Sequence, residues 1–182
     1  MRKVPKLFTI LLLITQIVNS QTFNDHIKKN QALVSKNRII WNTELNAGLG
    51  LSITNTDYSD HFFGLTSVLG YGITKDFQGG VGTGISFYNG GVIFPVFLDF
   101  RYFHNFGKMS VFPFGDGGLL FNFPDSKWNE GLFVNPGLGV RRLISEKLAA
   151  SLGVGLFVQK RPDDLRDSFI NAKLGINYIF KK

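Results

Sequence analysis

Apolar and polar residues alternate along most of this chain, and this alternation constrains the fold more than any other feature. In the first such run, one face of an extended strand would carry Ile39, Trp41, Thr43, Leu45, Ala47, Leu49, Leu51 and Ile53. The other face would carry Asn42, Glu44, Asn46, Gly48, Gly50 and Ser52. A period of two belongs to strands and not to helices. The run also exceeds the length of about 9–11 residues that a tilted transmembrane strand needs.

The same pattern predicts eight strands, near residues 39–53, 63–73, 77–88, 92–103, 109–123, 131–142, 148–160 and 168–180. The connections alternate in character. Mostly longer polar loops are expected at 54–62, 89–91, 124–130 and 161–167, of which 89–91 reads as a tight hairpin. Short turns are expected at 74–76, 104–108 and 143–147. Longer loops at one end and short turns at the other are typical of bacterial outer-membrane barrels.

One face of most predicted strands carries no charge. On 92–103 this face holds Val92, Phe94, Val96, Leu98, Phe100 and Tyr102. A Lys or Arg facing lipid at the bilayer midplane costs about 2–4 kcal/mol, so uncharged faces are what a bilayer selects. The sequence therefore predicts an all-β fold, an eight-stranded antiparallel up-and-down transmembrane β-barrel with an apolar outside and a polar lumen.

Two strands are ambiguous in this reading. Either face of 63–73 would be acceptable to lipid. On 109–123, Phe112 and Phe114 share a face with Asp116, which we assign to the lumen because a lone carboxylate in lipid carries the larger penalty. Pro95, Pro113 and Pro136 each lack a ladder donor and are expected to mark bulges or strand ends. Aromatic residues gather near the predicted strand ends, as interfacial girdles would require.

The first 20 residues read as a secretory signal. Arg2, Lys3 and Lys6 precede a short apolar run, and Val18 and Ser20 suit cleavage before Gln21. We expect a removed signal peptide at 1–20, a short periplasmic segment at 21–38 and the barrel at 39–180. Without the three basic residues of the signal, the formal charge falls from +7 to +4. The remaining basic residues form no stripe, so nucleic-acid binding is not expected.

The chain resembles the small eight-stranded outer-membrane barrels of the OmpA/OmpX-like superfamily, and more particularly the porin-family outer-membrane β-barrel domain. The resemblance rests on the signal peptide and on the stretches Phe94–Phe103, Val134–Gly139 and Ile176–Phe180. It implies a Gram-negative outer membrane as the location and outer-membrane lipid and lipopolysaccharide as surroundings. It also implies periplasmic chaperones and the barrel-assembly machinery as partners, with Tyr178 and Phe180 as the assembly signal.

The sequence contains no convincing catalytic, cofactor or metal site. Gly79–Gly84 resembles a phosphate-binding loop, but strand alternation continues where a helix should follow. Ser59, Asp60 and His61 could serve a lipid A-modifying enzyme, yet adjacent loop residues seldom converge on one bond. The charged residues of 161–167 read as a solvated loop surface, with a calcium or saccharide site as the alternative. The absence of Cys excludes disulfides and thiolate chemistry.

The candidate site is a charge network in the lumen. Glu44, Asp99 and Asp116 supply three inward negative charges, and Arg101, Arg141 and Lys173 supply three positive ones. We expect Arg101 to pair with Asp116 and Glu44 with Lys173, with Arg141 completing the network, because pairing offsets part of the desolvation of each charge. The alternative is a water-filled channel in which each charge is solvated.

These observations predict a non-enzymatic outer-membrane barrel with a structural or surface-interaction role and a plugged lumen. A narrow pore for ions or very small solutes is the first alternative, and a lipid A-modifying enzyme is the second. The sequence does not identify an extracellular partner.

Overall fold

The structure, a computed structural model, describes residues 37–51, 60–89, 91–122, 129–160 and 166–180. The predicted signal peptide and nearly all of the predicted periplasmic segment lie outside these residues. So do most of the predicted loops at 54–62, 124–130 and 161–167. Among the described residues there is no helix long and apolar enough to span a membrane.

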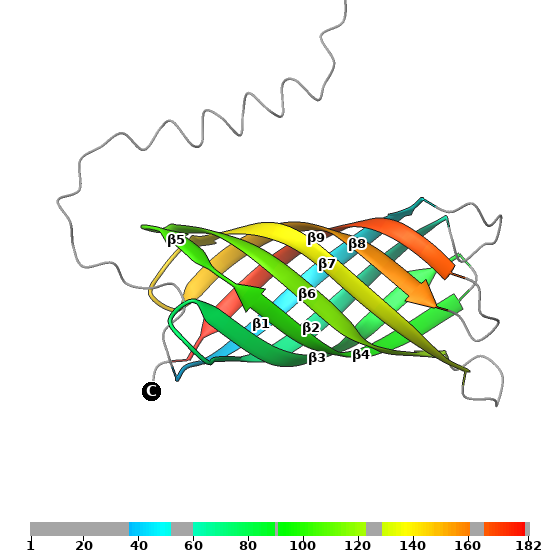
Figure 1. The fold of residues 1–182 in the computed structure, drawn as a ribbon, viewed down its shortest axis with the longest axis horizontal. Helices are drawn as coiled ribbons and strands as arrows, with labels where there is room; N and C mark the ends of the chain where they lie inside the picture. The colour runs from blue at the N-terminus through cyan, green and yellow to red at the C-terminus, as the bar shows by residue number, and fades with distance from the viewer. Residues whose placement is uncertain (1–36, 52–59, 90, 123–128, 161–165, 181–182) are drawn as a thin grey trace, which may run out of the picture. The chain divides into compact units, whose positions relative to one another are not determined.

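The described part of the chain forms nine antiparallel strands (Figure 1). They are β1 Ile39–Gly50, β2 His61–Gly72, β3 Phe77–Tyr88, β4 Gly91–Tyr102, β5 His104–Phe106, β6 Met109–Asn122, β7 Asn129–Leu143, β8 Leu148–Lys160 and β9 Arg166–Ile179. β4 and β5 pair with β6 in one continuous register and are two parts of a single strand. Each strand pairs with its neighbours in sequence, and the β1–β9 ladder closes the barrel. The predicted eight-stranded up-and-down barrel is therefore confirmed.

The strands are staggered around the barrel. Following register partners from Trp41 through Leu69, Val81, Leu98, Gly117, Val134, Val158 and Ser168 leads back to β1 at Leu51, ten residues further along. This stagger tilts the strands relative to the barrel axis, as Figure 1 shows. A closed barrel of eight strands has an interior just wide enough for side chains to fill.

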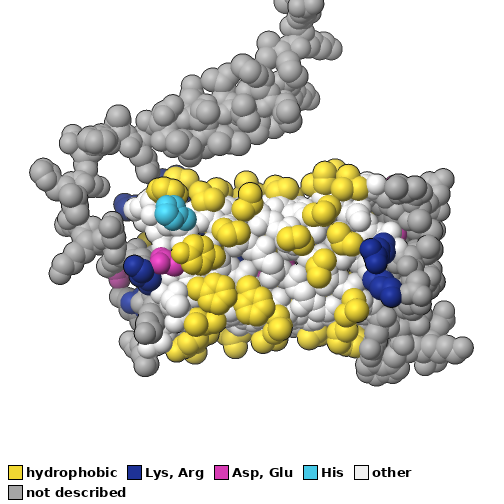
Figure 2. Space-filling view, viewed as in Figure 1, with side chains coloured by type: hydrophobic (Ala, Val, Ile, Leu, Met, Phe, Trp, Pro, Cys, Tyr) yellow, Lys and Arg dark blue, Asp and Glu magenta, His cyan; other side chains and the backbone are white. Residues whose placement is uncertain are grey.

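Side chains alternate strictly between the outside and the lumen. The outward positions include Trp41, Leu69 and Leu98, which are 51–61% exposed, and Figure 2 shows an apolar belt on the visible face. The structure resolves the ambiguous β2, on which Phe63, Leu65, Leu69 and Tyr71 point outward. It also places Asp116 in the lumen together with Phe112 and Phe114, as predicted.

Exposed aromatic residues lie near both ends of the belt. At the turn end, Phe77 stacks on Phe100, and Tyr178 contacts the ring of Phe180. On β2, Tyr71 near the turns and Phe63 near the loops are both about half exposed. They are eight positions apart, or about 26 Å along a strand. At a strand tilt of about 35–45° this spacing is about 20 Å along the barrel axis, so the two rings lie within the apolar band of about 25 Å that outer-membrane barrels have.

The structure corrects two expectations. The connection expected at 104–108 is shorter, because His104–Phe106 form β5 and the chain reverses at Gly107, whose φ is +62°. The prolines do not mark bulges. The β3–β4 ladder is interrupted beside Pro95 and the β7–β8 ladder beside Pro136, yet the register is the same on both sides of each gap. Because proline has no backbone N–H to donate, hydrogen bonding between the two strands is interrupted locally, but the strand is not shifted.

The first and last described residues lie at the same end of the barrel. Arg38 accepts a hydrogen bond from Gly72, and Phe180 donates one to Ile39, both beside the short turns. Pairing thus begins slightly before the predicted start at residue 39. An even number of strands brings the chain back to the end from which it started.

Candidate functional site in the lumen

Buried charged side chains from four strands meet in the middle of the lumen. Glu44 comes from β1, Asp99 and Arg101 from β4, Asp116 from β6 and Lys173 from β9. All five are at most 6% exposed. We call these five residues the ion cluster. Strand alternation places each of them inward, and the barrel's curvature then brings the long side chains together.

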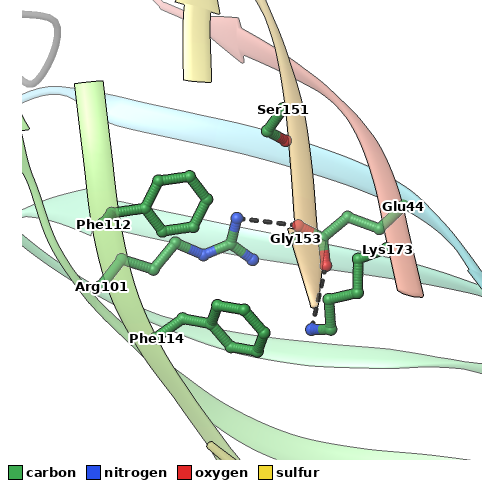
Figure 3. A pocket seen from close by; sticks show the side chains of 7 residues that line it. All are labelled: Glu44, Arg101, Phe112, Phe114, Ser151, Gly153 and Lys173. Carbon is green, nitrogen blue, oxygen red and sulfur yellow. Dashed lines mark hydrogen bonds and ion pairs between the residues drawn. The ribbon is translucent and has the colours of Figure 1, made fainter. Parts of the chain in front are cut away.

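Glu44 bridges the two cations of the ion cluster (Figure 3). One of its carboxylate oxygens lies 2.8 Å from Arg101, and the other lies 3.2 Å from Lys173. Its register partner on β9 is Gly175, where an added Cβ would lie 3.1 Å from the Glu44 side chain. The absence of a side chain at Gly175 leaves space for Glu44 to cross toward Lys173.

The other two acids lie directly opposite each other. Asp99 and Asp116 are register partners on β4 and β6. Arg101 donates from Nε and Nη2 to Asp99 at 2.8–2.9 Å, while Lys173 donates to Asp116. Asn135 also donates to Asp116, at 3.0 Å. Like charges at this separation repel, so the two cations are what allow both carboxylates to be buried here.

The pairing differs in part from the expectation. Glu44 contacts Lys173 as expected. Arg101, however, binds Asp99 and Glu44 and not Asp116, because Asp99 lies two positions away on the same face of the same strand. Asp116 is instead bound by Lys173.

Arg141 does not complete the network. Its guanidinium lies 3.6 Å from the ring centroid of Phe103, and it is 1% exposed. Within the described residues its Nε and Nη2 have no hydrogen-bond partner. The register explains this position, because Arg141 lies opposite Ser110 and Ser151 near the turn end, and no carboxylate lies opposite it.

Aromatic side chains form a buried cluster in the lumen on the loop side of the ion cluster. The rings of Phe62, Tyr88, Phe97, Phe133, Phe157 and Phe169 come from six strands and are joined by contacts of 5.0–5.9 Å between centroids. Ile93 and Leu120 belong to the same buried cluster. We call this group the loop-side layer.

A second apolar group lies on the turn side. It contains Ile40, Phe103, Phe112, Phe114 and Ile179, all at most 6% exposed. Phe112 and Phe114 also cover the cations, since Arg101 lies 5.7 Å from the first ring and Lys173 lies 4.8 Å from the second. Figure 3 shows Arg101 reaching between these two rings toward Glu44. We call this group the turn-side layer.

Little space remains between the layers. A cavity of about 10 Å³ is lined by Glu44, Arg101, Phe112, Phe114, Ser151, Gly153 and Lys173. This volume is at the lower limit for a single water molecule. The arrangement holds the charges in fixed positions, and the cavity among these described residues is too small for a substrate.

Inward glycines make room for the inward rings. A Cβ at Gly82 would overlap Phe97, one at Gly48 would overlap Phe62, and one at Gly139 would overlap Phe112. The Gly79–Gly84 stretch therefore serves packing, because β3 continues unbroken through it. A glycine beside each of these bulky side chains allows the rings to fill a narrow lumen without displacing the strands.

The sequence reading missed one buried acid. Asp167, expected on a solvated loop, lies on β9 with no exposed surface and accepts a hydrogen bond from Gln159 at 3.0 Å. Gln159 in turn accepts one from Tyr88 at 3.2 Å. The described lumen thus holds four acids and three bases, and the expected balance of three and three is wrong. Extending the alternation of β9 back by one position would have identified Asp167.

The remaining candidates for chemistry are not brought together. Asp60 and His61 are exposed at the loop end, and Ser59 lies outside the described residues, as do the charged residues 161–165. Among the residues whose positions are described, no group of three His, Cys, Asp or Glu side chains could hold a metal ion.

Comparison with known proteins identifies the fold alone. No protein-family model matches the chain, and no curated protein matches its sequence. Several solved structures match the barrel. The N-terminal β-barrel domain of Pseudomonas aeruginosa OprF matches with a TM-score of 0.50 and 15% identity, over 80% of this chain and 98% of that one. Neisserial surface protein A matches with a TM-score of 0.55 and 14% identity, over 79% of this chain and 97% of that one.

This is the fold of the small outer-membrane barrels. The architecture that the sequence predicted through its resemblance to the OmpA/OmpX-like superfamily is confirmed.

Proposed function

We propose that this protein is an integral barrel of the bacterial outer membrane with a structural or surface-interaction role and a closed lumen. The observation that carries the proposal is the inverted polarity of the barrel. The outward face exposes large apolar side chains around the barrel, while the lumen buries the ion cluster between the loop-side and turn-side layers. A water-soluble barrel would carry the opposite arrangement.

The closed lumen argues against general solute diffusion. The aromatic rings of the loop-side layer come from six strands and fill the lumen on that side. Below them, the described acids and cations of the ion cluster are bound to one another. An apolar layer of this kind excludes hydrated ions, since an ion would have to shed its water to cross it. The activity is therefore proposed to lie in the outer surface and the loops, and not in transport or catalysis.

A narrow pore remains the second candidate because of the buried polar side chains. Asn42, Gln78, Asn135, Asn171 and Asn177 all face the lumen and carry atoms without a hydrogen-bond partner in the described residues. Buried polar atoms nearly always bind a partner, and we propose water as the partner of these atoms. They would form a conducting path if the aromatic layers opened.

Assembly is proposed to use the end of β9. Tyr178 and Phe180 are 40% and 39% exposed, with ring centroids 4.9 Å apart, and β9 closes the barrel against β1. The proposed partners are periplasmic chaperones and the barrel-assembly machinery. The proposed location is reached by export with a signal peptide at residues 1–20.

Expression in a Gram-negative host that lacks its own general porins tests the proposal. We expect the protein in the outer-membrane fraction, resistant to urea extraction, with no increase in uptake of small sugars. Recovery in the soluble fraction would contradict the membrane location. Faster sugar uptake at equal expression would instead favour the pore.

A further inference from the structure

Arg141 is a buried cation with hydrogen-bond donors left over. Its side chain is 1% exposed, and within the described residues its Nε and Nη2 have no acceptor. The ring of Phe103 covers one face of the guanidinium, with its centroid 3.6 Å from the central carbon. A ring face offsets part of the charge, but it does not accept the N–H groups, which point outward in the guanidinium plane. Burying such donors without an acceptor is costly, so the position requires one.

The two leftover donors lie on the same edge of the guanidinium. The N–H bonds of Nε and Nη2 run nearly parallel along this edge, and their spacing matches the two oxygens of a carboxylate. A water molecule would accept a hydrogen bond there but would leave the positive charge uncompensated. A carboxylate would accept from both donors and neutralise the charge. The donor geometry of Arg141 therefore favours an anion with two acceptor oxygens.

The side chains beside Arg141 are neutral. Its register partners are Ser110 on β6 and Ser151 on β8, and both are buried. Ser151 accepts a hydrogen bond from Asn177 at 3.3 Å, which leaves the hydroxyl proton of Ser151 available for donation. Arg101 lies near enough to repel Arg141 electrostatically, while the acids of the ion cluster are bound to that cluster's own cations. These surroundings suit an anion better than a neutral ligand.

Arg141 lies close to the turn end of the lumen. Leu143, the last residue of β7, is the next inward position and is only half-buried. It packs against the turn-side layer. A ligand that enters past Leu143 would not cross the ion cluster, so the site is compatible with a closed lumen. Because the donors of Arg141 are almost completely enclosed, the ligand must be an anion of only a few atoms.

We propose that Arg141 binds a small carboxylate, of the size of formate, that enters the lumen from the turn end. The two oxygens of the carboxylate accept hydrogen bonds from Nε and Nη2, and the neighbouring Ser151 hydroxyl is the candidate for a third. The ligand supplies the counter-charge that the ion cluster does not give to Arg141. This assigns a ligand to the lumen, which the proposed function does not.

The first measurement follows the Nε–H signal of Arg141 by nuclear magnetic resonance, using the refolded, ¹⁵N-labelled mature protein in detergent micelles. The signal is identified by its loss in Arg141→Gln. It should shift progressively and saturate as formate replaces gluconate at constant ionic strength, because gluconate is too large for the enclosed position. Arg142→Gln is the matched control, since Arg142 is exposed at the same end of β7 and its loss should leave the shift unchanged.

The second measurement is the thermal unfolding midpoint in the same two salts. A ligand that binds only the folded barrel raises the midpoint, and formate at about ten times its dissociation constant should raise it by about 3–6 °C in the wild type and in Arg142→Gln. Arg141→Gln should show a rise of about 1 °C or less. Arg141→Lys keeps the charge but loses the two-donor edge, and it should also lose most of the rise.

Three results would overturn the inference. If the Arg141 signal did not respond to formate, its donors would be bound by water or by a carboxylate of the chain's own termini. An equal response to chloride would remove the role of the two-donor edge. An equal rise of the midpoint in Arg141→Gln and Arg141→Lys would place the bound anion elsewhere on the barrel. None of these results bears on ion conduction through the lumen.

Discussion

At the scale of single residues, Glu44 links the two cations of the ion cluster. Among the described carboxylates, it is the one bound to both, at 2.8 Å from Arg101 and 3.2 Å from Lys173. Buried charges of this kind stabilise little compared with a well-packed apolar core, but removing one partner leaves buried donors or acceptors with a hydrogen bond unmade. The cluster is therefore sensitive to single substitutions.

Glu44→Gln should lower the free energy of unfolding by about 1–3 kcal/mol, because Arg101 and Lys173 each lose a charge-assisted hydrogen bond while Arg101 keeps Asp99 and Lys173 keeps Asp116. Urea unfolding of the barrel in lipid vesicles measures the change. Asp60→Asn is the control, since Asp60 is exposed at the loop end, and a change within about 0.5 kcal/mol is expected there. If the two variants were equally stable, the ion cluster would have no structural role.

At the scale of strands, packing in the lumen depends on glycine positions that face aromatic rings. Gly82 on β3 lies against the ring of Phe97 on β4, and the two are register partners. By contrast, a Cβ at Gly115 on β6 would meet nothing within 4 Å. The two positions therefore separate the effect of lumen packing from the general effect of replacing glycine in a strand.

Gly82→Ala should destabilise the barrel by about 1–3 kcal/mol, because the new methyl group forces the Phe97 ring off its position. Gly115→Ala should be neutral or slightly stabilising, since it only restricts the unfolded chain. Thermal unfolding followed by circular dichroism checks both. Similar losses in the two variants would show that strand flexibility matters and that the Phe97 contact does not.

Strand positions and faces could be predicted from the sequence because alternation depends on one chain segment at a time. Trp41, Leu98 and Asp116 all point where the period of two placed them. Partners across the lumen could not be predicted in the same way. Arg101 pairs with Glu44, and Arg141 lies against Phe103 apart from the ion cluster. Both positions depend on the stagger between strands and on side-chain length, which the pattern of one strand does not reveal. Asp167 was missed because the predicted strand begins at residue 168, whereas β9 begins at Arg166.

At the scale of the whole molecule, the topology predicts which segments are accessible in intact cells. Both described ends of the chain and the short turns lie at one end of the barrel, and the strand ends that flank residues 52–59, 123–128 and 161–165 lie at the other. We expect the longer connections to face the exterior and the chain ends to face the periplasm.

Trypsin added to intact cells should therefore cleave at Lys127, or around Arg161 and Arg166 at Lys160 or Arg166, because trypsin does not cleave the Arg161–Pro162 bond. It should leave the turn-end residues Lys75 and Lys147 intact. Mass spectrometry of the released peptides identifies the cut sites, and permeabilised cells provide the comparison. Cleavage confined to the segment from Lys28 to Arg38 in intact cells would reverse the orientation.

The central claim is that the side chains in the lumen close it. Two apolar layers and the ion cluster lie in series along the barrel axis, so an ion must cross all three. Single-channel recording of the wild-type barrel in planar bilayers tests this claim most directly. The account predicts no resolved current steps in molar potassium chloride. A stable current proportional to voltage would contradict it and would establish the narrow pore.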